Sequence, residues 1–206
     1  MSKKEVEISS LSDFIPPETY HLVEPFLLHY KVHLTITRSR ATVLGDYRNA
    51  IAGKAHRISV NGNLNAYAFL ITLLHELAHL ITFEQHGHRV ASHGKEWKGQ
   101  FAALLKHFLL NNVFPEDIKK QLTASLQSPA ASSCADDGLM RVLRKYDNVK
   151  QDHFLVEEIQ QGACFQAKNG KIYRREEKIR KRIKAVEIET GRVYLFSPIY
   201  EVIKIS

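Results

Sequence analysis

Apolar and polar residues follow two different periods in the first 110 residues of the chain. From position 32 to 37 they alternate one by one, which predicts a half-buried strand. Shorter stretches at 42–48 and 57–61 predict two more strands, in a small sheet that is antiparallel in part. Residues 64–85 are apolar on nearly all sides and contain no Gly or Pro, which predicts a helix in the centre of a domain.

Helical spacing of apolar residues recurs on both sides of this central segment. Asn63 or Asn65 can cap the start of the central helix, and Gly87 suits the left-handed position after its end. Pro25 should kink or divide the helix in which it lies, because proline lacks an N–H donor and crowds the preceding turn. The further predicted helices cover residues 16–30, 92–110, 115–126 and 139–146.

The last third of the chain has a different pattern. Residues 125–138 are rich in Ser, Ala and Asp, which is typical of a linker. Strands are expected beyond it, with hairpin turns at Asn169-Gly170 and Thr190-Gly191. The predicted strands cover residues 163–168, 171–174, 178–188 and 192–196. The residues expected to form the core of this module are Phe165, Ile172, Tyr173, Ile183, Val186, Ile188, Tyr194 and Phe196.

Composition excludes several classes of protein. The chain has 206 residues, of which 44% are hydrophobic and 25% charged, as in globular proteins rather than disordered, collagen-like or membrane proteins. No stretch of 18 apolar residues lacks a charge, and the opening lysines precede no apolar core, so we expect neither a membrane span nor a secretory signal. Cys134 and Cys164 lie too far apart in sequence for a paired-thiolate site, which favours a cytoplasmic location. The oligomeric state is not indicated.

The net charge of +7 is concentrated in one segment. Residues 168–184 contain nine Lys or Arg and only two Glu, so the rest of the chain is neutral overall. Such a segment could attract nucleic acid, or it could be a solvated strand face that protects a sheet edge from aggregation. Aromatic residues between the charges could stack on unpaired bases, although a place in the core is favoured. The candidate nucleic-acid contacts are Lys171, Arg174, Arg175, Lys178, Arg180, Lys181 and Arg182.

The central helix contains the sequence His75-Glu76-Leu77-Ala78-His79. With 3.6 residues per turn, His75 and His79 lie on one face and can bind a single metal ion, with Glu76 beside it. Two imidazoles and a carboxylate buried among leucines are costly unless a partner satisfies them, and a zinc ion with its water would do so. We therefore predict one Zn²⁺ ion at this motif.

A catalytic zinc usually has three protein ligands, so the third must come from elsewhere. His93 is favoured because it lies in the first turn of the next helix, on the face that packs inward, and Gly94 beside it allows close backbone approach. Glu96 follows in the same helix and is an alternative. The remaining candidates are Glu84, His86 and His88.

Four segments in this order, ITRSRATVLGDYR, HRISVNGNLN, TLLHELAH and SHGKEW, resemble the SprT-like family of zinc metallopeptidases, to which the protease Spartan belongs. The resemblance covers roughly residues 20–124. It implies His75, His79 and His93 as metal ligands and Glu76 as the catalytic base. The tail differs from that of many members, because it lacks the paired cysteines of a C-terminal zinc ribbon and resembles a ribbon that has lost its metal.

The expected fold is therefore α+β, with a zincin-like metallopeptidase domain, a small sheet plus the central helix, followed by a small basic β-ribbon. The expected boundaries are 1–124 for the catalytic domain, 125–150 for a linker with a short helix, and 151–206 for the metal-free ribbon. Zinc would activate water, and Glu76 would take its proton, so that a peptide bond is hydrolysed. Tyr47 and His88 are candidates for supporting the oxyanion.

The resemblance also implies substrates that are bound or crosslinked to DNA, with the basic ribbon supplying affinity for nucleic acid. The alternative is a non-hydrolytic nucleic-acid-binding or transcription-associated factor, in which zinc only fixes the fold. A structural metal would normally be closed by a fourth protein ligand, and only His86, His88 or Glu84 could supply one.

Overall fold

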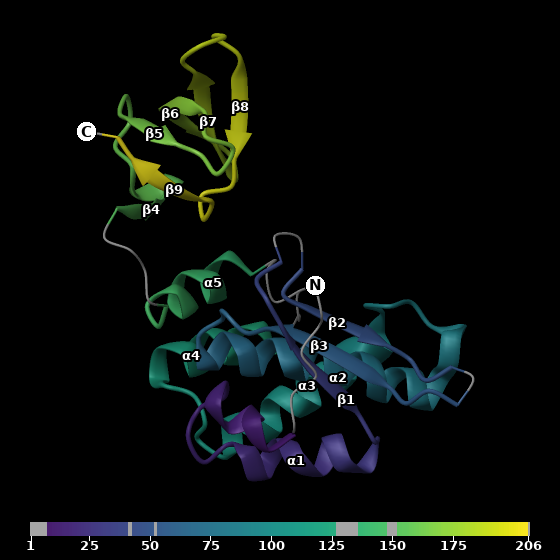
Figure 1. Cartoon of the computed structure of the whole chain (residues 1–206). Coiled ribbons are helices and arrows are strands. Elements are labelled where there is room, and N and C mark those ends of the chain that lie inside the picture. Colours follow the sequence, from purple (N-terminus) through teal and green to yellow (C-terminus); the bar gives the residue numbers. More distant parts are fainter. Residues whose placement is uncertain (1–7, 41–42, 52, 127–135, 148–151, 206) are drawn as a thin grey trace. The chain divides into compact units, whose positions relative to one another are not determined.

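The computed structural model describes residues 8–40, 43–51, 53–126, 136–147 and 152–205 of the 206. The chain divides into two compact units, Met1–Asp147 and Asn148–Ser206, and each is described by itself. The protein is α+β, as the sequence predicts, because helices dominate the first unit and strands the second (Figure 1). The predicted linker falls largely on residues 127–135 and 148–151, which lie outside the described residues.

A three-stranded sheet forms one layer of the first unit. Its strands are β1 (His33–Thr37), β2 (Gly45–Arg48) and β3 (Arg57–Asn61), in the order β1-β3-β2. β1 runs parallel to β3 and β2 runs antiparallel to it, so the expected mixed sheet is confirmed. β2 is a sheet edge and begins at Gly45, later than predicted.

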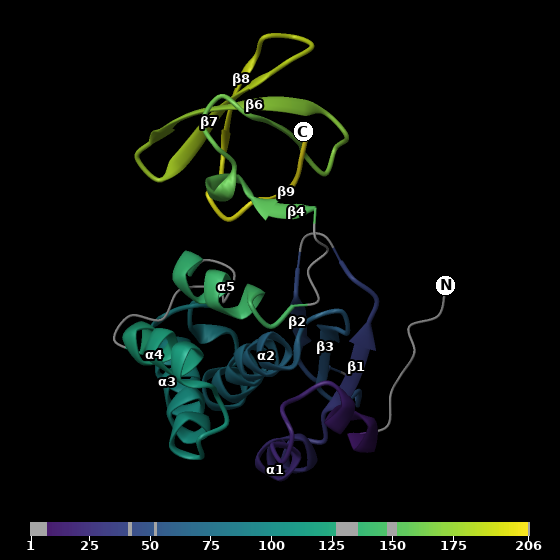
Figure 2. The ribbon, with the colours of Figure 1, turned by 90° about the vertical axis from the view of Figure 1, so that its left-hand side faces the viewer.

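The central helix α2 (Ala66–His86) lies between this sheet and α3 (Lys95–Leu110) (Figure 2). Its start is capped by the Asn65 side chain, which accepts a 2.9 Å hydrogen bond from the Ala68 N–H, and Gly87 follows its end with a φ of 60°. By length and composition alone α2 could cross a membrane. However, 72% of its apolar window is buried within the protein, which is the position of a core helix.

The other elements of the first unit complete its core. α1 (Tyr20–His29) passes through Pro25 as one helix, so the expected division does not occur, and it buries Val23 and Leu27 completely. The 3₁₀ segments η1 (Ile8–Asp13) and η2 (Gly87–Arg89) precede α1 and follow α2 respectively. α4 covers Glu116–Ser125.

The short helix α5 (Asp137–Arg144) belongs to the first unit, not to a linker. Leu139 and Leu143 are each 3% exposed and are part of the same core as α2. The Tyr146 hydroxyl donates a 2.7 Å hydrogen bond to the Asp117 carboxylate at the start of α4. The first unit therefore extends to Asp147 rather than to the expected boundary at 124. The sequence does not indicate this, because two leucines one turn apart are a weak signal beside a polar segment.

The second unit is a six-stranded antiparallel sheet in the order β4-β9-β5-β6-β7-β8. The expected turns are present, with φ of 81° at Gly170 and 68° at Gly191. β4 and β9 were not predicted. The strands are β4 (His153–Leu155), β5 (Cys164–Gln166), β6 (Ile172–Ile179), β7 (Arg182–Glu187), β8 (Val193–Phe196) and β9 (Glu201–Lys204), with the 3₁₀ segment η4 (Val156–Glu158) after β4.

The charged segment differs from its prediction. β6 continues to Ile179, and the chain turns at Arg180 and Lys181, whereas two separate strands with a break near 175–177 were expected. Arg180 has a φ of 53°, and the pairing with β7 shifts between Arg175 and Lys178. The turn contains no Gly, Asn or Pro, so the sequence does not indicate it. The irregular pairing disrupts the two-residue alternation, so the sequence does not indicate that β6 is continuous.

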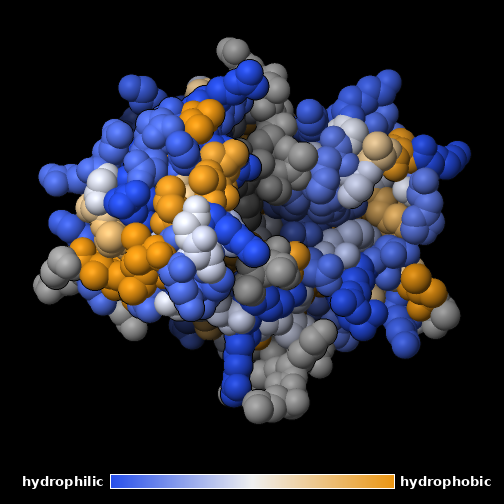
Figure 3. Space-filling model, turned by 90° about the horizontal axis from the view of Figure 1, so that it is seen from above, coloured by the Kyte–Doolittle hydropathy of each residue, from blue (hydrophilic) through white to orange (hydrophobic). Residues whose placement is uncertain are grey.

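The core of the second unit contains part of the predicted set. Phe165, Tyr173 and Ile183 are at most 2% exposed. Ile172 and Ile188 are instead 41% and 52% exposed, because their neighbours Tyr173 and Glu187 are the residues that face inward. Figure 3 shows orange apolar patches among hydrophilic residues in the view from above. The Phe196 ring packs edge-on against Tyr173 at 5.0 Å, so these aromatics form the core.

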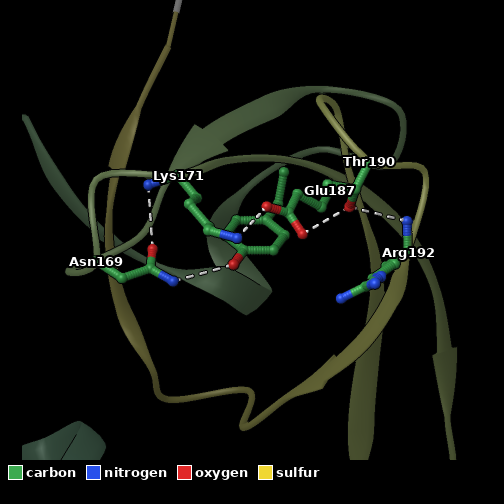
Figure 4. A network of polar contacts seen from close by, with 6 residues as sticks. Asn169, Lys171, Glu187, Thr190 and Arg192 are labelled. Carbon is green, nitrogen blue, oxygen red and sulfur yellow. Dashed lines mark hydrogen bonds and ion pairs between the residues drawn. The ribbon is translucent and has the colours of Figure 1, made fainter.

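A polar network joins the two hairpin turns of the second unit (Figure 4). The Glu187 carboxylate, 1% exposed, accepts hydrogen bonds from the Lys171 ammonium and, at 2.8 Å, from the Thr190 hydroxyl. Asn169 donates at 3.1 Å to the Tyr173 hydroxyl and accepts at 3.1 Å from the Lys171 N–H. Glu187 thus ties the turn at Asn169 to the turn at Thr190.

Candidate metal centre

Three histidines converge at one point of the first unit. His75 and His79 project from the same face of α2, as their spacing predicts. His93 lies before α3, which begins at Lys95, and not in the first turn of that helix as expected. The Nε2 atoms of His79 and His93 lie 3.2 and 3.3 Å from Nε2 of His75. His75 is 7% exposed, and the other two are half-buried. The structure therefore brings together the three residues that the sequence favours.

Burial keeps these imidazoles neutral. It lowers the pKa of His75 to about 3 and that of His79 to about 4, and neighbouring histidines add to both shifts. Burial also lowers the pKa of His93. Each ring therefore has an unprotonated nitrogen available near neutral pH, which is the form that binds a metal ion.

The spacing fits a tetrahedral ion. For zinc–nitrogen bonds of about 2.0–2.1 Å, two ligand nitrogens at the tetrahedral angle are about 3.3 Å apart. The two measured separations, 3.2 and 3.3 Å, match this value. Three neutral rings with nitrogens this close cannot all be hydrogen-bonded to one another well, because each neutral imidazole has only one N–H to donate. A cation at their centre satisfies all three.

An aromatic wall holds the rings in place. The Trp97 ring is fully buried, and its centroid lies 4.7, 5.3 and 4.6 Å from those of His75, His79 and His93. Phe101 stacks on Trp97 at 5.1 Å and packs edge-on against His75 at 5.6 Å. Both residues come from α3, on the inward face that the sequence predicts. The positions of the ligands are thus fixed by packing between α2 and α3.

Glu76 is the second polar group of the site and is 6% exposed. Burial raises the pKa of its carboxyl to about 8, and the charge of Asp46 adds to the rise. The Arg40 charge and a hydrogen bond from the Tyr47 backbone N–H act in the opposite direction. A carboxyl with a pKa near neutrality is suited to take up and release a proton.

The other candidate ligands lie apart from the cluster. Glu84 contacts His56, whose Nε2 is 3.2 Å from its Oε1, and Glu96 lies 3.9 Å from the Lys95 ammonium. The His88 ring packs against Phe83 at 5.1 Å. Among the described residues, neither His86 nor any of these three joins the group of possible ligands.

A cavity of about 230 Å³ opens beside His79. Tyr47 and His88, the two oxyanion candidates, both line it, together with Phe83 and Val90. The Tyr47 hydroxyl lies 2.9 Å from His56 Nδ1, and burial raises the pKa of this hydroxyl well above its usual value. His56 Nδ1 also accepts from the Ala50 N–H, so Nδ1 is the unprotonated nitrogen and the Tyr47 hydroxyl is its donor.

Residues upstream of the helix complete the site and were not predicted. Arg40 donates to Asn61 at 2.7 Å and to Ser59 at 3.1 Å, so its charge is held on β3 near Glu76. Gly45 and Asp46 belong to β2, about thirty residues before the motif. The sequence shows these residues only as part of a strand, since nothing in a linear pattern indicates which strand crosses the helix.

Comparison with known proteins agrees with this geometry. No solved structure matches the chain with significant similarity. Residues 23–119 match the SprT-like family, a span that contains β1–β3, α2, α3 and all three clustered histidines. The chain therefore contains a SprT-like domain, as the sequence predicts, and this domain provides the candidate metal centre.

Proposed function

We propose that this protein is a zinc-dependent endopeptidase. The observation that carries the proposal is the convergence of three neutral imidazole nitrogens at tetrahedral spacing, with a buried carboxylate on the adjacent residue of the same helix. His75, His79 and His93 would hold the ion. Bound zinc would supply Lewis-acid chemistry, which polarises a substrate carbonyl and makes water more acidic.

The chain's own residues carry the proton transfers. Glu76 accepts the proton of the attacking water while Arg40 and the Tyr47 N–H favour its ionised form. Once it is protonated, it can deliver the proton to the leaving amine, which is the stronger base. Burial of the carboxyl excludes bulk water that would compete for this proton.

β2 offers a place for the substrate backbone. It is one of the two edge strands of the sheet, and the backbone groups on its outer side pair with no other strand among the described residues. An extended peptide could add to this edge by main-chain hydrogen bonds to groups other than the Tyr47 N–H, which donates to Glu76. The cavity beside His79 could then receive a side chain. Recognition of the backbone rather than of a sequence is consistent with a broad range of protein substrates.

The test is hydrolysis of an unfolded protein by the zinc-loaded full chain and by Glu76→Gln. We expect wild-type hydrolysis, with a loss of about 10²–10⁴-fold in the variant at equal zinc content, because only the base is removed. Full activity of the variant with zinc retained, or no hydrolysis by zinc-loaded wild type, would contradict the proposal.

The non-hydrolytic alternative predicts a metal site closed by protein. Within the described part of the chain the cluster has three members, neither Glu84 nor Glu96 is among them, and Glu84 contacts His56 instead. A site with three protein ligands and one open position is the arrangement of catalytic rather than structural zinc. This supports the peptidase.

We also propose that the substrates are proteins on DNA, with nucleic acid bound by the turn between β6 and β7. Of the seven predicted contacts, Lys171 is held by Glu187, Arg174 pairs with Glu176 at 2.9 Å, and Arg175 is half-buried. The other four are exposed and have no ion pair within the described residues; they are Lys178, Arg180, Lys181 and Arg182, named here the hairpin tip.

The hairpin tip is tested with Arg180→Asn/Lys181→Gln, since Asn tolerates the left-handed conformation at position 180. The matched control is Lys119→Gln/Lys120→Gln on α4, which removes the same charge from the first unit. We expect the tip variant alone to weaken DNA binding. It should also reduce the slope of log affinity against log salt by roughly 0.7–0.9 for each phosphate that the protein no longer neutralises. Equal effects of both variants would show a response to net charge only.

A further inference from the structure

Gly45 occupies a place in β2 where a Cβ atom would collide with two side chains of α2 unless they moved. A Cβ atom at this position would lie 2.6 Å from Oε1 and 2.9 Å from Cγ of Glu76. It would also lie 2.8 Å from Cγ2 of Thr72, one turn earlier on α2. All three distances are shorter than real Cβ contacts. The backbone of Gly45 has no positive φ, so space rather than conformation requires glycine here.

The pairing of β2 shows how its backbone meets Glu76. The Asn61 N–H donates to the Leu44 carbonyl at 2.9 Å, and Asp46 is aligned with Ser59. Alternate residues of an antiparallel strand direct their N–H and C=O groups to opposite sides. Leu44 and Asp46 therefore face β3, whereas Gly45 and Tyr47 face the free edge. The Tyr47 N–H at this edge donates to the Glu76 carboxylate.

We propose that Gly45 is a positioning residue for Glu76. The missing side chain leaves the space in which the carboxylate lies against β2, and there the Tyr47 N–H holds it. This inference rests on the proposed function, in which Glu76 is the base. Glu76 is thus positioned by the sheet, while the three histidines are positioned by α2 and α3, so that a change at Gly45 moves the base and leaves the ligands in place.

The first experiment places Gly45→Ala in a Thr72→Ser background, because the serine removes the methyl group that would also meet the new Cβ. The serine hydroxyl can keep the 2.8 Å hydrogen bond of Thr72 to the Ala68 carbonyl. Relative to Thr72→Ser alone, we expect kcat to fall about 10–100-fold, as for a reacting group displaced by about 1 Å, with KM and zinc affinity changed less than threefold. Gly99→Ala on α3 is the control, since a Cβ there meets nothing within 4 Å.

The second measurement does not need activity. In the zinc-loaded protein, hydrogen exchange of the Tyr47 amide should be at least tenfold faster in Gly45→Ala/Thr72→Ser than in Thr72→Ser, because the carboxylate that protects this N–H has moved. Exchange of the Asp46 amide, which pairs with β3, should not change. The same comparison in Gly99→Ala should show no difference from wild type.

The outcomes separate this inference from the proposed function. If wild type does not hydrolyse protein but Tyr47 exchange responds as expected, the peptidase proposal fails, and the inference that Gly45 positions Glu76 is kept. Unchanged kcat and unchanged Tyr47 exchange would overturn the inference. The inference would also be overturned if adding Gly45→Ala/Thr72→Ser to Glu76→Gln lowered kcat by the same factor as it does when Glu76 is present. A residue that acts through Glu76 has no effect once that carboxylate is gone.

Discussion

Among the described residues each unit buries one glutamate, and the two carboxylates have opposite surroundings. Glu187 in the second unit is 1% exposed, and its ion pair with Lys171 lowers the pKa of its carboxyl. Glu76 in the first unit is 6% exposed, and burial raises the pKa of its carboxyl to about 8. Lys171 and Thr190 donate hydrogen bonds directly to Glu187. The positive charge that favours the ionised form of Glu76 is that of Arg40, and this side chain donates instead to Asn61 of β3.

The difference separates a structural carboxylate from a reactive one. A buried charge with a direct cation and hydrogen bonds is satisfied and holds elements together. A buried carboxylate without a direct cation is costly to ionise, and proteins keep such groups mainly where chemistry uses them. The contrast between Glu76 and Glu187 therefore favours Glu76 as the carboxylate that carries the proposed chemistry, on grounds separate from the histidine cluster.

The largest expected difference is in activity. Glu76→Gln should lower kcat by about 10²–10⁴-fold, whereas Glu187→Gln should leave kcat within about twofold of wild type, because only Glu76 lies at the metal centre. Hydrolysis of one unfolded protein by both zinc-loaded variants measures this. A comparable loss in Glu187→Gln would mean that the second unit also contributes to the reaction.

Removal of one ligand should have the next largest effect. His93→Ala should weaken zinc binding by more than about 100-fold, which is the upper range for residues that only support ligands. The added stability that zinc gives to wild type should shrink accordingly. Competition with a chelator measures the affinity, and His88→Ala is the control because its ring packs on Phe83 outside the cluster. Equal losses in both variants would make His88 a ligand.

The pH dependence of stability should distinguish the two carboxylates next. Between its usual pKa of 4.5 and about 8, metal-free folded protein keeps a proton on Glu76 that the unfolded chain has lost. The free energy of unfolding therefore falls as pH rises, by at most about 1.4 kcal/mol per pH unit. Buried His75 and His79 act with the opposite sign below pH 6.5, but they are common to both proteins in the comparison that follows.

Glu76→Gln has no such proton to lose. The variant should therefore gain stability over metal-free wild type as pH rises from 5 to 8, with a gain of about 1–3 kcal/mol at pH 8. Urea unfolding at several pH values measures the gain. A gain that does not grow with pH would show that the Glu76 carboxyl is ionised throughout this range.

The sequence predicts the histidines and Glu76 because their chemistry is encoded in local spacing. His75 and His79 share a face by helix periodicity alone. His93, expected in the first turn of the next helix, lies before that helix begins and still joins the cluster. Gly45 and Arg40 could not be predicted, since their roles depend on which strand crosses α2 and at which register. The turn at Arg180 was missed for a related reason, because its formation depends on pairing between β6 and β7 and not on turn residues.

The smallest expected effect concerns the structural carboxylate. Glu187→Gln should lower the melting temperature of the second unit by several degrees, because Lys171 loses its charged partner and Thr190 a charged acceptor. Unlike Glu76→Gln, it should not raise stability at any pH between 5 and 8, since its carboxyl has a lowered pKa. Glu189→Gln, exposed and two residues away on the same turn, is the matched control. Thermal unfolding followed in both variants measures the difference, and a gain in stability for Glu187→Gln near pH 8 would mean that this buried carboxylate is no better satisfied than Glu76.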